Sequence, residues 1–319
     1  MSTHHTLVTG GAGFIGSHLC RYLLNIGHDV TVVDNMSTGR EDNIADLADN
    51  PRFTLRAADV SLPGSFVELD TLTHIVHLAC PASPKANTRM PLDTIRACSV
   101  GTLNVLDLAA RTGTRVVCAS SSEIYGDPLE HPQNETYRGN CDPVGAFSAY
   151  TEGKRVLEAA AAAHVREGTN AGIIRPFNIY GPNMWPEDGR VVSSFCASAL
   201  RGATLEIAGG EQTRSFCYIG DFIEGVVRMM DSDAFGPVNL GNPACEVSIA
   251  ELAQLVVRIA GTGRAQIVPG RSGETHRRQP DTDLAARVLS WSAITSLDTG
   301  IERTLDWMSQ VIHAESSVR

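Results

Sequence analysis

Ser121, Tyr150 and Lys154 are residue types that together can oxidise an alcohol. Tyr150 and Lys154 are four positions apart in the segment SAYTEGKR, so on a helix their side chains project from the same face. A free phenol has a pKa of about 10, roughly 3 units too high for a base at neutral pH, and an adjacent ammonium group favours the phenolate. The chain holds 24 arginines but only two lysines, so chance explains this pairing poorly. We predict that Tyr150 is the base and that Lys154 and Ser121 assist it.

Glu123 stands two residues after Ser121, in the stretch ASSSEIYGD. Alcohol oxidation by a serine, a tyrosine and a lysine does not require a further carboxylate at this position. Glu123 therefore indicates a reaction with a second step at the same site.

The stretch TGGAGFIG predicts a dinucleotide site, because it follows a short β-branched run and opens a helical one. Its glycines permit a tight turn and bring backbone N–H groups at a helix start close to a pyrophosphate. Asp34 closes the next strand, where a carboxylate binds the ribose hydroxyls and repels a 2′-phosphate, so we predict NAD rather than NADP. The predicted cofactor-binding residues are Gly10, Gly13, Phe14, Ile15, Gly16, Asp34, Asn35, Thr38, Gly39, Asp59, Val60, Leu78, Tyr150 and Lys154.

Strands and helices alternate along the first half of the chain, which predicts an α/β fold with a Rossmann-type, doubly wound parallel sheet. After Pro176 the pattern loosens into loops and shorter elements, so we expect a smaller carboxy-terminal substrate-binding lobe. The expected division is an NAD-binding domain over 1–176 and a substrate-binding lobe over 177–319, with part of 211–241 packing back on the first domain. The predicted strands are 6–10, 30–34, 52–59, 74–79, 114–121 and 171–176, and the predicted helices are about 14–26, 91–111 and 148–168.

The composition is that of a globular protein, with 43% hydrophobic and 19% charged residues. A formal net charge of −10 argues against binding to nucleic acid, which requires a basic face. The eight cysteines form no C-x-x-C pair, so we predict neither a metal site nor a disulfide scaffold. Since no stretch resembles a membrane span or a signal peptide, we expect a cytoplasmic protein without a membrane partner.

Over essentially its whole length the chain resembles the extended short-chain dehydrogenase/reductase family of nucleotide-sugar enzymes, and within it most resembles those that decarboxylate UDP-glucuronate. The matching stretches include TGGAGFIGSHL, HLACPASP, ASSSEIYGDP, YTEGKR, DGRVVSSF, QTRSFCYIGD and RRQPD. The resemblance implies a UDP-sugar substrate and a homodimer formed through the helices near 91–111 and 148–168. It assigns catalysis to Ser121, Glu123, Tyr150, Lys154 and Arg278, and substrate binding to Pro81, Ser83, Arg96, Asn178, Arg190, Arg214, Tyr218 and Arg278.

The reaction that this resemblance implies depends on a transient ketone at C4 of the sugar. The C6 carboxylate is then β to the ketone, so CO₂ can leave, and return of the hydride yields UDP-xylose with NAD recycled. Tyr150 and Ser121 would donate hydrogen bonds to O4, and Arg278 would be the counter-ion of the substrate carboxylate. We hypothesise that Glu123 orders a water or shifts protons at C5, and that its charge disfavours the bound carboxylate relative to CO₂.

Other activities on the same 4-keto sugar differ at a few positions. Dehydratases of the family usually read D-E where this chain has Ser122 and Glu123, so the acid that they use is missing. Glucuronate 4-epimerases usually have a small residue at the position of Glu123. UDP-apiose/xylose synthases carry a cysteine in the segment that matches LACPASPKANTRMPLDTI. Because Cys80 lies in this segment, that activity is an alternative to decarboxylation, and 4-epimerisation is another alternative. Cys98 departs from the family, which usually has an asparagine there.

Overall fold

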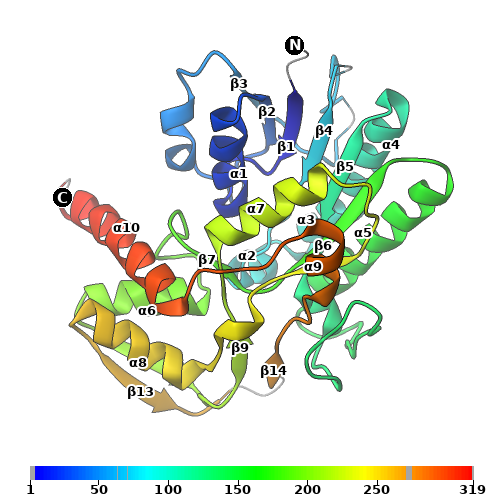
Figure 1. The fold of residues 1–319 in the computed structure, drawn as a ribbon. Coiled ribbons are helices and arrows are strands. Elements are labelled where there is room, and N and C mark those ends of the chain that lie inside the picture. Colours follow the sequence, from blue (N-terminus) through cyan, green and yellow to red (C-terminus); the bar gives the residue numbers. More distant parts are fainter. Residues whose placement is uncertain (1–3, 63, 70, 271–274, 318–319) are drawn as a thin grey trace.

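A seven-stranded parallel sheet forms the centre of the computed structural model, which describes residues 4–62, 64–69, 71–270 and 275–317 (Figure 1). The strand order is β11-β6-β5-β4-β1-β2-β3, so the chain runs outward on one side of β1 and then returns to its other side at β4. At such a switch point the loops leave the carboxyl ends of the strands in opposite directions and open a crevice. The strands are β1 His5–Thr9, β2 Asp29–Asp34, β3 Phe53–Ala57, β4 His74–His77, β5 Arg115–Ala119, β6 Ala171–Pro176 and β11 Val238–Leu240.

Helices cover both faces of this sheet, and for this reason the central strands read as nearly continuous apolar runs. Alternate residues of one strand belong to opposite cores: Leu7 packs with one set of helices and Val8 with the other. The first core includes side chains of α4 (Thr102–Thr112) and α5 (Ser148–Arg166), and the second includes those of α1 (Phe14–Asn25) and α7 (Ile219–Met230). The sheet is thereby rigid enough to position the loops at its carboxyl edge.

The helix predicted over 91–111 is divided in the structure. It consists of α3 (Pro91–Arg96), a π-helical turn over Ala97–Gly101, and α4. A π turn inserts one extra residue per turn, so the side chains that follow it are rotated relative to those that precede it, and such turns are frequent at functional sites. Cys98 lies within this turn and is fully buried.

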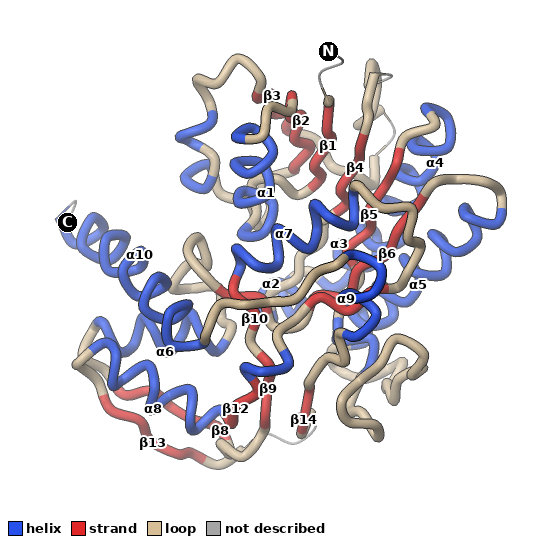
Figure 2. Tube along the Cα trace, viewed as in Figure 1, coloured by secondary structure: helices blue, strands red, loops and turns tan. Residues whose placement is uncertain are grey.

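Part of the chain after Pro176 forms a group of helices and strands to one side of the central sheet (Figure 2), and its buried side chains form a third hydrophobic core. Its helices are α6 (Val191–Leu200), α8 (Ile249–Ala260) and α10 (Leu297–Ser317), beside the parallel pair β8 (Thr204–Ala208) and β13 (Arg264–Val268). A small sheet of β12 (Glu246–Ser248), β9 (Thr213–Ser215) and β14 (Arg277–Arg278) lies next to them. In contrast, α7 and β11 return to the central sheet, where β11 is the seventh strand and pairs with β6. The division into an NAD-binding domain and a substrate-binding lobe at about Pro176 remains a proposal.

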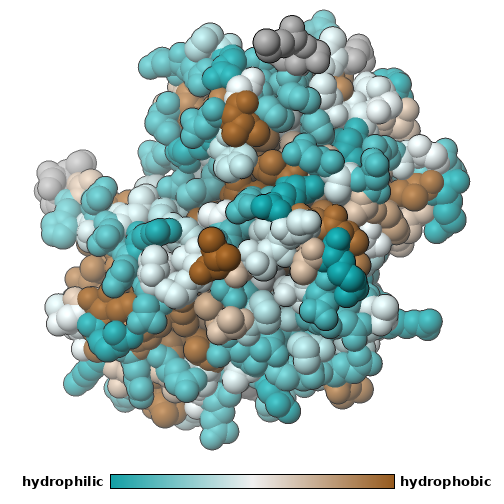
Figure 3. All heavy atoms as spheres, in the orientation of Figure 1, coloured by the Kyte–Doolittle hydropathy of each residue, from teal (hydrophilic) through white to brown (hydrophobic). Residues whose placement is uncertain are grey.

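The surface carries no extended apolar face on the side drawn in Figure 3. Hydrophilic side chains predominate over the upper part, and hydrophobic ones gather mainly at the lower left, near α8 and α10. Within the described ranges, no helix is long and apolar enough to cross a membrane.

Candidate active site

A cavity of about 1290 Å³ lies at the carboxyl edge of the central sheet. It is lined by the loops after β1, β2, β4 and β5, by the first turns of α5, and by residues of the part that follows Pro176. Ligand pockets usually measure about 300–1,000 Å³, so this cavity has room for a dinucleotide and a second ligand together.

The glycine turn at one end of the cavity fits a dinucleotide pyrophosphate. Gly10 adopts a φ of +73°, which favours glycine, and a side chain on Gly16 would overlap the carbonyl oxygen of Gly10. Helix α1 begins directly after Gly13, which has no side chain to cap the first N–H groups. These groups are therefore available to an anion at the positive end of the helix dipole.

Asp34 lies at the end of β2 in the wall of the same cavity. Its carboxylate accepts hydrogen bonds from the backbone N–H groups of Ala12 at 3.0 Å and Met36 at 2.9 Å. Burial raises the pKa of Asp34, and the two N–H groups oppose that rise. Each carboxylate oxygen retains a lone pair, so Asp34 can also accept the ribose hydroxyls of NAD.

The structure brings every predicted cofactor-binding residue to the wall of this one cavity. They are Gly10, Gly13, Phe14, Ile15, Gly16, Asp34, Asn35, Thr38, Gly39, Asp59, Val60, Leu78, Tyr150 and Lys154. Asp59 is held by Asn35, which donates a hydrogen bond of 2.8 Å to it. The individual roles of these residues remain predictions.

Tyr150 and Lys154 lie in the first turns of α5, as their spacing predicts. Lys154 is 3% exposed and donates a hydrogen bond of 2.7 Å to the carbonyl oxygen of Ala119, the last residue of β5. Its Nζ lies 5.8 Å from the centre of the Tyr150 ring. The lysine therefore ties α5 to the end of β5, two residues before Ser121.

Burial dominates the electrostatics of Tyr150. It raises the pKa of the phenol above 10, while the positive charge of Lys154 and a hydrogen bond with Ser121 lower it. In the protein alone, the ammonium group thus does not bring the phenol into the neutral range. Burial also disfavours the charged form of Lys154, but Cys80, Cys98 and Tyr150 more than offset this and raise its pKa. Lys154 therefore stays cationic, and the positive charge of oxidised NAD is the further source of phenolate stabilisation that we expect.

Ser121→Ala should move the acidic limb of the pH–rate profile to higher pH. Without its hydrogen bond the pKa of Tyr150 rises, so less phenolate exists at a given pH. We expect a shift of up to about one pH unit and a roughly tenfold lower turnover at pH 7, measured as kcat/KM against pH.

Ser120→Ala is the matched control, since the Ser120 hydroxyl is buried and hydrogen-bonds to no other described residue. An unshifted limb in Ser121→Ala, or an equal shift in Ser120→Ala, contradicts the role of Ser121.

Glu123 and Arg278 form an ion pair across the cavity. Arg278 is only 2% exposed, whereas the Glu123 side chain is 44% exposed to the cavity. The second terminal nitrogen of Arg278 donates to the carbonyl oxygen of Gly126 and to the Thr275 hydroxyl, each at 3.1 Å. Arg278 Nε is buried and has no hydrogen-bond partner in the described part of the chain. Arg278 was predicted as a counter-ion for a substrate carboxylate, but in the structure Glu123 already balances its charge.

The ion pair keeps Glu123 negatively charged. Burial raises the pKa of Glu123, but the charge and hydrogen bond of Arg278, together with the charges of Arg214 and Arg190, lower it below its ordinary value. Arg214 lies on β9 directly opposite Arg278 on β14. The site therefore holds an ionised carboxylate among three guanidinium groups.

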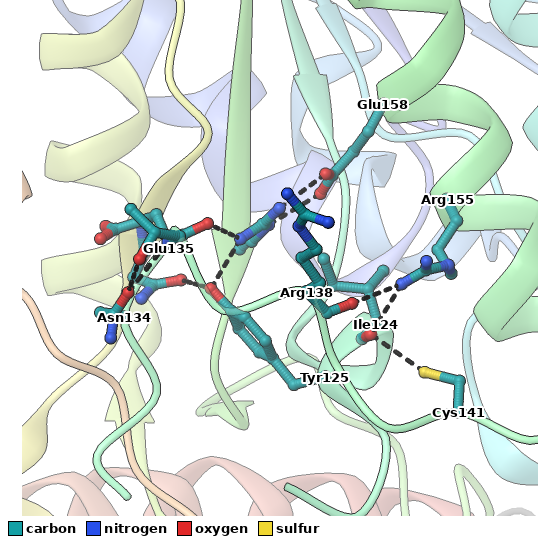
Figure 4. Close-up of polar contacts among 11 residues, drawn as sticks. Ile124, Tyr125, Asn134, Glu135, Arg138, Cys141, Arg155 and Glu158 are labelled. Atoms are coloured by element: carbon teal, nitrogen blue, oxygen red, sulfur yellow. Dashed lines mark hydrogen bonds and ion pairs between the residues drawn. The ribbon is translucent and has the colours of Figure 1, made fainter. Parts of the chain in front are cut away.

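A buried network fixes the short helix Ser122–Tyr125 that carries Glu123 (Figure 4). The Tyr125 hydroxyl donates to Asn239 at 2.8 Å and accepts a hydrogen bond of 2.7 Å from Arg175. Arg175 also binds both carboxylate oxygens of Glu158 on α5, at 2.8 and 2.7 Å. The network joins β6, α5 and β11 to the turn at Glu123, which lets the ion pair keep one geometry.

Arg175→Leu should lower the free energy of unfolding by about 3 kcal/mol, because it leaves the largely buried Glu158 carboxylate without its partner. Urea denaturation measures the change. The control is Arg258→Leu, which breaks a pair that is more than half exposed on both sides and should cost less than about 1 kcal/mol. Equal losses in both variants contradict the importance of the network.

The predicted substrate-binding residues fall into two groups. Those that line the cavity are Pro81, Ser83, Asn178, Arg190, Arg214 and Arg278. Arg96 and Tyr218 are not among the described residues that line it. Arg96 is exposed on α3 and pairs with Asp93 at 2.9 Å, while the Tyr218 ring packs beneath the Arg303 guanidinium.

Sequence reasoning assigned no role to Trp185, which also lines the cavity. The Arg40 guanidinium stacks over its ring at 3.5 Å, and its Nε1 donates to Asn43 at 2.8 Å. The loop GPNMWPEDGR that holds Trp185 therefore contacts the segment that follows β2, at Arg40 and Asn43. The unusual motif was visible in the sequence, but this long-range contact was not.

The fold and the cavity define a Rossmann-type enzyme with a serine, tyrosine and lysine set beside a dinucleotide site. The chain belongs to the NAD dependent epimerase/dehydratase family, which it matches over residues 6–241. NAD is thus its cofactor, in agreement with the fit of the glycine turn and Asp34.

Three comparisons illustrate these similarities. The chain is 44% identical to UDP-glucuronic acid decarboxylase 1 of Arabidopsis thaliana, over 97% of this chain and 71% of that one. Its fold matches UDP-glucose 4-epimerase of Thermotoga maritima with a TM-score of 0.89 at 26% identity, covering 97% and 99% of the two chains. It also matches MoeE5, solved in complex with UDP-glucuronic acid and NAD, with a TM-score of 0.82 at 27% identity, covering 96% and 99%.

Proposed function

We propose that this protein is an NAD-dependent decarboxylase that converts UDP-glucuronate to UDP-xylose. One observation carries the proposal: a single cavity holds the Ser121, Tyr150 and Lys154 set together with the ionised pair of Glu123 and Arg278. The first three suit oxidation of an alcohol, and the pair supplies charge for a second step. The similarity to UDP-glucuronic acid decarboxylase 1 supports the same assignment.

The residues of the chain divide the work as follows. Tyr150 takes the proton of the C4 hydroxyl, with Lys154 stabilising the phenolate. When bound, NAD would supply the redox chemistry, which is reversible transfer of the C4 hydride. Tyr150 and Ser121 then donate hydrogen bonds to O4 as negative charge develops there during the loss of CO₂. Arg190 and Arg214 suit the diphosphate, since a guanidinium binds phosphate oxygens in a fork.

Glu123 acts on the substrate carboxylate. Because it stays ionised, it repels the bound carboxylate more than the neutral CO₂ that leaves, and this difference favours decarboxylation. Arg278 limits the repulsion enough for the substrate to bind. Glu123 also orders a water or shifts the proton that C5 receives.

Incubation of the purified protein with UDP-glucuronate and NAD tests the function directly. Mass spectrometry should show a product smaller than the substrate by one CO₂, and NMR should identify a xylose ring. An unchanged mass refutes the proposal and favours 4-epimerisation. The same loss with a branched, contracted ring favours an apiose/xylose synthase, the second candidate, which Cys80 in the cavity wall supports.

We also propose a homodimer formed through α3, α4 and α5. These neighbouring helices and the π turn between α3 and α4 expose large hydrophobic side chains that a monomer would leave in water: Leu92, Ile95, Val100, Leu103 and Val156. The eight cysteines are free thiols, which supports a reducing compartment such as the cytoplasm.

Leu103→Glu should convert the protein to a monomer in light scattering after size exclusion, because a buried carboxylate in the interface is strongly unfavourable. We expect dimer affinity to fall at least a hundredfold, equivalent to about 3 kcal/mol. Leu129→Glu is the control, since Leu129 is exposed but lies outside these helices. A wild-type chain that elutes as a monomer refutes the homodimer.

A further inference from the structure

Cys80 and Cys98 form a thiol pair at the wall of the active site that the proposed reaction does not use. Their Sγ atoms are 3.2 Å apart, although the residues are separated by 18 positions in the chain. Cys80 lies in the loop after β4 and lines the cavity, whereas Cys98 lies behind it, fully buried in the π turn. An oxidant that enters the cavity can therefore reach one sulfur with the other directly behind it.

The packing of α5 against the π turn holds this pair in place. A side chain on Gly153 would stand 3.0 Å from Cβ and 3.4 Å from Sγ of Cys98, so glycine permits the close approach of α5. Gly153 directly precedes Lys154 and is three residues beyond Tyr150. The thiol pair is thus in contact with the helix that carries the proposed base.

We propose that Cys80 and Cys98 form a reversible disulfide in response to hydroperoxides, and that the disulfide switches the enzyme off. This inference goes beyond the proposed function, because formation of the bond can be measured whatever the enzyme catalyses.

The reaction needs one hydroperoxide and two thiols. A thiolate of the pair attacks one peroxide oxygen, so that an S–O bond forms and the O–O bond breaks. The other peroxide oxygen takes up a proton and leaves as an alcohol, or as water when the oxidant is H₂O₂. The second sulfur then attacks the sulfenic acid; the S–S bond forms, the S–O bond breaks and water leaves. The two thiols are oxidised by two electrons and the peroxide is reduced. The hydrogen bond with Cys80 and the charge of Lys154 lower the pKa of Cys98 to about 7 against the effect of burial, whereas the same hydrogen bond and burial raise the pKa of Cys80. The pair therefore supplies one thiolate near neutral pH, and Cys80, the sulfur at the cavity wall, attacks the peroxide once the shared proton has moved to Cys98 across the 3.2 Å contact.

Closing the bond displaces the cavity wall. A disulfide requires an S–S distance of about 2.05 Å, so the sulfur atoms must approach by about 1 Å. Cys80 follows Ala79, whose backbone packs directly against Gly10 of the dinucleotide turn, and precedes Pro81 of the cavity wall. Because a misplacement of about 1 Å in a catalytic site can reduce the rate up to about a hundredfold, we expect turnover to fall at least tenfold.

Limited oxidation of the NAD-loaded protein with H₂O₂ tests the proposal. After denaturation and alkylation, mass spectrometry should show two fewer alkylated thiols, and peptide mapping should link Cys80 to Cys98. Turnover should fall at least tenfold and return with dithiothreitol. Cys98→Ser should keep its untreated activity, form no link and resist the same dose. Cys196→Ser, which removes a buried thiol on α6, should remain sensitive.

Three results would overturn the proposal: no link between Cys80 and Cys98, a complete link with unchanged turnover, or equal sensitivity of Cys98→Ser and the wild type. If Cys98→Ser does not fold, Cys98→Ala serves the same purpose. Mapping of the link in the wild-type protein decides the chemical step without any variant.

Discussion

Tyr150→Phe should abolish measurable turnover while NAD remains bound. The substitution removes only the hydroxyl that takes the C4 proton, and loss of a general base typically reduces rates by about 10²–10⁴-fold. We expect a loss of at least about 10³-fold, equivalent to roughly 4 kcal/mol of transition-state stabilisation. Lys154 is anchored by Ala119 and not by the phenol, so the wall of the cofactor site should keep its shape. Product formation measures turnover, and calorimetry measures the affinity for NAD.

The control for this variant is Tyr22→Phe, which removes a hydroxyl from a partly exposed tyrosine on α1 outside the cavity. It should match the wild type in both measurements. If Tyr150→Phe loses NAD affinity to the same extent as turnover, Tyr150 is mainly a cofactor contact. If it retains turnover, another residue is the base.

The central sheet and the dinucleotide turn were predictable because both are local in the sequence. Apolar runs marked six strands, and the glycines marked the turn between β1 and α1. The place of the seventh strand, β11, beside β6 depends on pairing between residues more than 60 positions apart. No local pattern specifies such a register.

The active site was predictable only in part for the same reason. Glu123 and Arg278 were both selected, but their contact spans 155 residues and depends on the pairing of β14 with β9. Motif matching assigned Arg278 to a substrate carboxylate, which stays a prediction, and it could not reveal that Arg278 also pairs with Glu123. Similarly, Cys98 approaches Cys80 from within a π turn, and the helical pattern of 91–111 reveals neither that turn nor the contact across 18 residues.

Glu123→Gln should slow the release of CO₂ about a hundredfold and at the same time lower the KM for UDP-glucuronate. The neutral amide no longer repels the substrate carboxylate, and the buried Arg278 gains an unbalanced positive charge that attracts it. The bound substrate is then stabilised more than the transition state, in which the carboxylate loses its charge, so kcat and KM fall together. A merely structural role of Glu123 would not lower KM. Steady-state kinetics with detection of CO₂ separates the two constants.

Without substrate, Glu123→Gln should also be less stable than the wild-type protein, and substrate should remove most of this difference. Breaking a fully buried ion pair costs about 3–5 kcal/mol, but Glu123 faces the solvent-accessible cavity, so we expect a loss nearer about 1–2 kcal/mol. UDP-glucuronate should restore most of this stability in thermal denaturation, because its carboxylate replaces Glu123 beside Arg278. Glu206→Gln, which neutralises another carboxylate of the cavity wall, should show neither effect. Normal CO₂ release in Glu123→Gln contradicts the role proposed for Glu123, and the decarboxylation step must then depend on the ketone and the hydrogen bonds to O4 alone.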